Sequence, residues 1–87
     1  MIHLDTVERY DGSMEELAAD VGDLKYDALA EFLNLLASKI EADGDKDKAR
    51  GRVKLAHELH SSADALRQSA ESIDRAWVIC EPFMPKD

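Results

Sequence analysis

Residues 47–81 decide the fold, and they read DKARGRVKLAHELHSSADALRQSAESIDRAWVICE. Alanine recurs in this stretch every seven residues until a tryptophan takes the next place, and a second apolar column of the same period follows three residues later. The two columns are Ala49, Ala56, Ala63, Ala70 and Trp77, and Leu59, Leu66, Ile73 and Cys80. Apolar columns with this alternating spacing predict one long helix with a buried seam.

The long helix is expected over residues 46–81. Pro82 cannot extend a helix and disfavours helical geometry at the preceding residue, so the helix should end there. Gly51 costs about 1 kcal/mol inside a helix, so the regular part is expected to begin near Val53. Residues 82–87 form a tail, in which two apolar residues, Phe83 and Met84, are expected to fold back and cap the seam beside Trp77.

A short helix is predicted over residues 13–22. Ser13 and Glu16 have the spacing of a capping box, in which each side chain bonds the backbone of the other residue. Gly22 is the expected left-handed end of this helix. Residues 1–12 precede it as an arm, since no second strand-like segment is available to pair with them.

A second helix is predicted over residues 23–43, with Asp23 as its N-cap and Gly44 at its end. Two apolar stripes run along it. The first consists of Leu29, Phe32, Leu33, Leu36 and Ile40, and the second of Leu24, Ala28, Leu35 and Ala42. Together they cover more than half of the circumference, so we expect this helix to have at least two packing partners.

Composition places narrow limits on the class of protein. The chain has 87 residues, which allows a single domain, and its formal net charge of −8 disfavours nucleic acid and anionic membranes as partners. No apolar run approaches the ~20 residues that a membrane span needs. A single cysteine cannot form an internal disulfide and favours a cytoplasmic location. We therefore expect an all-α cytoplasmic protein.

Two long helices joined by a turn form one layer, and a layer leaves two faces to cover. A second copy related by a twofold axis would close an antiparallel bundle, so a homodimer is expected. The residues expected in the dimer or core seam are Ala56, Leu59, Ala63, Leu66, Ala70, Ile73 and Trp77. The predicted function is that of a non-catalytic, self-associating interaction module, with an unidentified protein as a further candidate partner.

Charge is distributed unevenly along the chain. Residues 1–45 hold twelve acids and three bases, whereas residues 46–87 hold seven acids and eight bases. Five bases fall close together and are a candidate contact for an anion or an acidic partner: Lys46, Lys48, Arg50, Arg52 and Lys54. In the predicted arrangement they lie near the N-terminus of the long helix, where the helix dipole disfavours cations.

Two further groups could carry chemistry. His57, His60 and Asp64 are spaced to project from one side of the long helix, which makes them a candidate cation site. Glu71 and Asp74 are three residues apart, the spacing with which helical enzymes present carboxylates to a divalent metal. The alternative prediction is accordingly a metal-dependent all-α hydrolase of a nucleotide or phosphate ester. No cofactor is expected for the interaction module.

Overall fold

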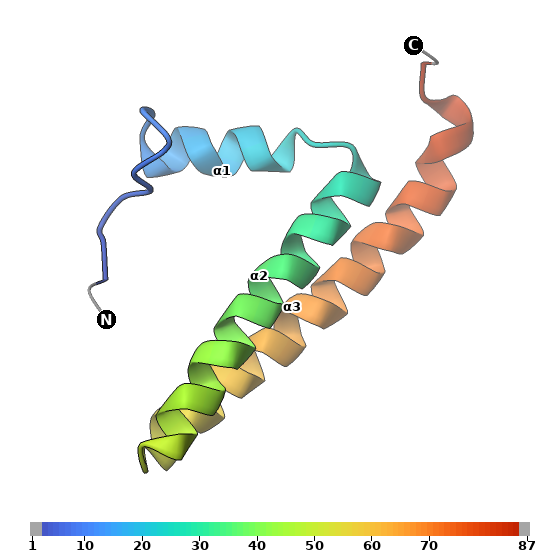
Figure 1. Cartoon of the computed structure of the whole chain (residues 1–87). Helices are drawn as coiled ribbons and strands as arrows, with labels where there is room; N and C mark the ends of the chain where they lie inside the picture. The colour runs from blue at the N-terminus through green and yellow to red at the C-terminus, as the bar shows by residue number, and fades with distance from the viewer. Residues whose placement is uncertain (1–2, 86–87) are drawn as a thin grey trace.

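The protein is all-α, and a computed structural model describes residues 3–85. The described chain forms α1 (Met14–Gly22), α2 (Tyr26–Ala49), α3 (Val53–Cys80) and a short 3-10 helix, η1 (Glu81–Phe83). Helices α2 and α3 lie side by side as an antiparallel hairpin, and α1 projects from its open end (Figure 1). Residues 1–2 of the predicted arm and 86–87 of the predicted tail lie outside the described part. No helix within it is long and apolar enough to cross a membrane.

The capping box at the start of α1 is confirmed. The Glu16 amide donates to Ser13 Oγ at 3.1 Å, and the Ser13 amide donates to Glu16 Oε1 at 3.0 Å. The predicted left-handed ending at Gly22 is wrong, since Gly51 alone among the described residues has a positive φ. Asp23 instead closes the helix in right-handed geometry, with its amide bonded to the Ala19 carbonyl at 3.0 Å.

The predicted bounds of the second helix are wrong at both ends. Asp23 is used as the C-cap of α1, so α2 begins after Lys25, which makes no side-chain capping bond. At the other end α2 continues through Gly44 to Ala49. A glycine costs a helix only about 1 kcal/mol, and here close packing against α3 offsets that cost.

The turn lies at residues 50–52, later than predicted. Gly51 adopts φ 81°, a left-handed conformation that favours glycine. The Arg52 amide donates to the Asp47 carbonyl at 2.8 Å, and the Arg52 guanidinium pairs with the Asp47 carboxylate at 3.2 Å. The long helix is therefore shorter than the predicted 46–81, because residues 46–49 belong to α2.

Small residues form the buried centre of the seam between α2 and α3. One helix contributes Ala30, Ala37 and Gly44, and the other Ala56, Ala63 and Ala70. The five alanines are at most 2% exposed, and no large side chain of the described residues is fully buried. Small residues let two helix axes approach to the short end of the usual 8–10 Å range. The predicted alanine column thus packs against the same chain, on a matching column of α2 that we did not predict.

Gly44 marks the closest approach in the seam. A Cβ added there would lie 2.6 Å from His60 Cδ2 and 3.3 Å from Leu59 Cβ, both on α3. These distances are shorter than van der Waals contact, so the α3 side chains occupy the space that a Gly44 side chain would need. Packing therefore explains why a glycine lies inside α2.

The molecule is elongated rather than compact. Its radius of gyration is 15.7 Å and its extents are 50 × 30 × 17 Å, whereas a compact domain of this length would have a radius near ~12 Å. Helix α1 packs extensively against neither α2 nor α3 in residues 3–85. The fold is therefore one layer of two helices.

The C-terminal tail caps the seam only in part. Trp77 and Cys80 are half-buried, and Met84 lies beside them at the open end of the hairpin. Phe83 is 85% exposed, so the prediction that it folds back with Met84 is wrong. Helix η1 follows α3 directly and turns the chain so that Phe83 faces solvent.

The seam predicts a strong dependence on side-chain size at Ala63. Ala63→Leu places three extra carbons where the side chain is 0% exposed, and we expect a loss of about 1–3 kcal/mol in the free energy of unfolding from overpacking. Urea unfolding followed by circular dichroism measures this loss. The matched control is Ala65→Leu, two residues away and exposed, which should change the free energy by less than about 0.5 kcal/mol. Equal losses in the two variants would contradict the seam.

Candidate functional site

The hairpin has one polar face, and ion pairs identify it. Arg67 of α3 makes two bonds to the Glu41 carboxylate of α2, at 2.9 and 3.2 Å. Near the tip, His60 Nε2 lies 2.9 Å from Asp45 Oδ1. Because His60 and Arg67 each follow a seam alanine by four residues, they project on the same side of α3.

The opposite face is mostly apolar. On each helix, the residue three positions after a seam residue and the residue one position before it project to the other side. Because α2 and α3 are antiparallel, these positions lie on the same side of the hairpin. We call this surface the apolar face; α2 contributes Tyr26, Leu29, Leu33, Leu36 and Ile40, and α3 contributes Leu55, Leu59, Leu66, Ile73 and Cys80. Polar residues occupy other positions of this side: Ser62 and Ser69 on α3, and Asp43 and Asp47 near the tip on α2. The position of Gly44 agrees with this assignment. Gly44 lies in the seam and is close both to Leu59 on the apolar face and to His60 on the polar face.

The apolar face is partly open to solvent along its length. Tyr26 is 41% exposed, Leu36 37% and Leu55 46%, and the other members are half-buried by the hairpin itself. Leucines that are half-covered and aligned on one side resemble the inner surface of a helical bundle from which one half is absent. Such a surface is a candidate for interaction with another apolar surface.

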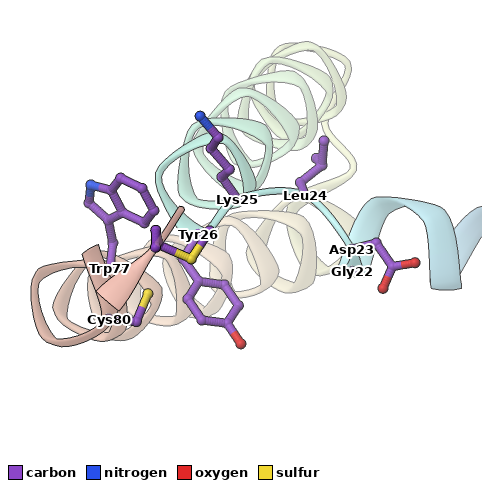
Figure 2. Close-up of a pocket in the computed structure, with 8 residues that line it drawn as sticks. Gly22, Asp23, Leu24, Lys25, Tyr26, Trp77 and Cys80 are labelled. Carbon is purple, nitrogen blue, oxygen red and sulfur yellow. The ribbon is translucent and has the colours of Figure 1, made fainter. Parts of the chain in front are cut away.

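A shallow depression lies at each end of the apolar face. At the open end, a depression of about 410 Å³ is lined by Tyr26, Trp77, Cys80 and Met84, with the α1–α2 connection at its rim. Figure 2 shows the Tyr26 ring and Cys80 on the same side of the hairpin. At the tip, a depression of about 290 Å³ is lined by Leu55, Leu59, His3 of the arm and charged residues that include Asp43 and Asp47.

The second predicted stripe of α2 is mostly exposed in the described part of the chain. Leu24, Leu35 and Ala42 are exposed, Leu35 at 63%, whereas Ala28 is half-buried. Phe32, which we placed on the first stripe, is 40% exposed and lies on the outward side of α2. We predicted at least two packing partners for this helix. Within the described chain, only α3 packs extensively against it.

The predicted seam residues divide into two groups. Ala56, Ala63 and Ala70 are buried against α2, so they are occupied within one copy. Leu59, Leu66 and Ile73 are half-buried on the apolar face, and Trp77 is half-buried at the open end. Sequence reasoning missed the α2 column Ala30, Ala37 and Gly44, although its seven-residue period was visible.

The five clustered bases surround the hairpin tip, but the electrostatic prediction for two of them is wrong. Lys46 and Lys48 lie in the last turn of α2, where the helix dipole stabilises cations instead of disfavouring them. Arg50 is the C-cap of α2 and Arg52 the N-cap of α3, and Lys54 lies in the first turn of α3. The dipole effect is reversed because the turn lies at residues 50–52, so Lys46 and Lys48 belong to the end of α2 and not to the start of the long helix.

The candidate metal ligands are not gathered into a cluster. Within residues 3–85 no group of three histidine, cysteine, aspartate or glutamate side chains is placed to hold a metal ion. His57 is exposed, His60 is paired with Asp45, and Asp64 lies 3.7 Å from Arg67. Glu71 and Asp74 are exposed on α3.

Asp43 is a charged residue at the tip end of the apolar face. Lys39 Nζ bonds Asp43 Oδ2, and this hydrogen bond lowers the pKa of the Asp43 carboxyl below its ordinary value of 3.8. The second oxygen, Oδ1, is buried and has no hydrogen-bond partner in the described part of the chain. Buried polar atoms in folded proteins nearly always have a hydrogen-bond partner.

The arm is fastened to α1. The Tyr10 hydroxyl donates a short hydrogen bond to the Asp20 carboxylate, which raises the pKa of Tyr10. The ring also lies where a Cβ on Gly12 would be 2.7 Å from Tyr10 Cε1. The arm thus holds to α1 through Tyr10, while His3 near its start lies beside Asp43 at the hairpin tip.

Comparisons of this chain with protein-family models, with curated proteins and with solved structures find no match.

The Lys39–Asp43 bond gives a pH prediction. Because the carboxylate is favoured in the folded state, its stabilising contribution is present above the ordinary pKa of 3.8 and is lost as pH falls through the lower folded value. In a carboxyl NMR titration we expect Asp43 to titrate below 3.8, and Lys39→Met should raise its pKa. Lys25→Met, which removes a lysine remote from Asp43, is the control. An unchanged Asp43 pKa in Lys39→Met would contradict the assigned cause.

Proposed function

We propose that the protein is a non-catalytic, self-associating interaction module, in which the apolar faces of two copies pack together as a four-helix bundle. The apolar face carries this proposal. It runs from Leu55 to Cys80 on α3 and from Tyr26 to Ile40 on α2, and it lies opposite the face that holds the Arg67–Glu41 and His60–Asp45 pairs. An amphipathic layer buries its apolar side most simply against another such layer.

The size of the face supports a second copy as its occupant. Its members run from Tyr26 to Ile40 on α2 and from Leu55 to Cys80 on α3, which is about 22 and 39 Å at ~1.5 Å per residue. At ~9 Å per helix the face covers on the order of 550 Å² per copy, near the lower end of what each partner contributes to a standard interface of ~800 Å² per side.

The chain's own α1 is too short to cover this face. It has nine residues, which reach only about 13 Å. A twofold dimer, in contrast, matches the face with an identical surface of the same length. The proposal thus revises the expected dimer seam: leucines of the apolar face replace the alanines, which are already packed within each hairpin.

Other parts of the proposal follow from composition. The unpaired Cys80 is in keeping with a reducing cytoplasm. The outward side of α2, where Leu35 and Phe32 are exposed, remains accessible in such a dimer and is where an unidentified protein partner could bind. Apolar side chains that are exposed singly are common on protein surfaces.

Adjacent leucines provide a matched test of the proposal. Leu36 belongs to the apolar face, whereas Leu35 points outward and is 63% exposed. Sedimentation equilibrium should give about twice the 9.7 kDa chain mass for the unaltered protein. Leu36→Lys should weaken dimerisation at least about tenfold, because it places a charge in an apolar interface.

Leu35→Lys is the control and should leave the dimer intact. Circular dichroism at the same concentrations tests whether both variants keep the helical hairpin. A monomeric mass for the unaltered protein, or equal effects of the two substitutions, would contradict the proposal.

A further inference from the structure

We infer that the two copies pack with their hairpin tips at opposite ends, so that the basic tip of each meets the acidic α1 end of the other. This inference rests on the proposed self-association and specifies its geometry. The apolar face is buried in either orientation, although its members run from Leu55 to Cys80 on α3 and only from Tyr26 to Ile40 on α2. The ends of the hairpin are what distinguish one orientation from the other.

Symmetry leaves two arrangements to compare. If the twofold axis lies along the helices, both tips fall at the same end of the bundle. If the axis is perpendicular to the helices and parallel to the plane of the hairpin, the tips fall at opposite ends, and α2 pairs antiparallel with α2 of the partner. In both arrangements neighbouring helices are antiparallel, so helix packing permits either one.

The charge distribution favours one of the two arrangements over the other. Residues 45–54 around the tip hold five bases and two acids, a balance of +3, whereas residues 14–31 at the open end hold six acids and one base, a balance of −5. Tips at the same end would place two basic regions together and two acidic regions together. Tips at opposite ends place each basic region beside an acidic one, twice per dimer by symmetry. Complementary potentials of this kind determine the orientation of an interface.

Four basic residues at the tip are available to pair with acidic residues of a partner. Arg52 is paired with Asp47, but Lys46, Lys48, Arg50 and Lys54 form no ion pair within residues 3–85. The acidic helix α1 is likewise free of the hairpin, since it packs extensively on neither α2 nor α3. Figure 1 shows α1 extending away from the hairpin, where a second copy can reach it.

A distance between spin labels tests the orientation. We would replace the native thiol by Cys80→Ser and introduce Ala49→Cys, an exposed position at the end of α2. With tips at opposite ends, the two labels lie about 35 Å apart or more, by the ~1.5 Å rise of each helix. Double electron–electron resonance on the dimer should show this long distance.

The outcomes of this measurement are distinguishable. A distance below about 25 Å in a dimer means that the tips lie together, which overturns this inference and leaves the proposed self-association intact. The absence of any dipolar coupling, with a monomeric mass, overturns the self-association and the inference with it.

Charge reversal provides a second, independent test. Lys48→Glu with Arg50→Glu should raise the dimer dissociation constant about tenfold or more at low salt, and adding Glu15→Lys with Asp23→Lys should restore most of the affinity. The control adds two negative charges on the outward side of the middle of α3, Ser61→Glu with Gln68→Glu, and should have a much smaller effect. A failure of the second pair to restore affinity would overturn the proposed contact between tip and α1.

Discussion

Close approach of α2 and α3 through a seam of small residues is the constraint on which the rest of the structure depends. The alanines bring the two helix axes close together, and Gly44 allows contact with Leu59 and His60 that a side chain would block. Because the seam is so narrow, the larger apolar residues cannot enter it. They are displaced to one side of the hairpin and remain partly exposed, which creates the apolar face.

The same constraint links the fold to the proposed function. Alanine burial contributes little hydrophobic stabilisation, since the effect scales with the apolar area removed from water. A hairpin whose buried centre is this seam leaves large apolar side chains such as Tyr26, Leu36 and Leu55 exposed, and its shape is elongated, with extents of 50 × 30 × 17 Å. Packing two such layers together would bury the leucines and produce a conventional core. Polar residues on the opposite face and the uneven charge along the hairpin then direct how the layers meet.

Much of the fold could be predicted from the sequence, because periodicity and capping are local signals. The seven-residue alanine column predicted α3, and Ser13 with Glu16 predicted the start of α1. The turn was misplaced because Gly44 has the usual signature of a helix end, whereas its role depends on contact with α3. The sequence also did not determine which helix packs against the alanine column, because a heptad seam has the same pattern whether it packs within a chain or between chains. The revised position of the turn also changed the electrostatic setting of Lys46 and Lys48.

The central claim is that the alanines pack within one chain while the leucines of the apolar face pack between chains. An isotope-filtered NOE experiment on a mixture of labelled and unlabelled protein tests it most directly. The account predicts intermolecular NOEs from the methyl groups of Leu36 and Leu66, and only intramolecular NOEs between the methyl groups of Ala37 and Ala63. Intermolecular NOEs from Ala63, or none from Leu36 and Leu66, would contradict it.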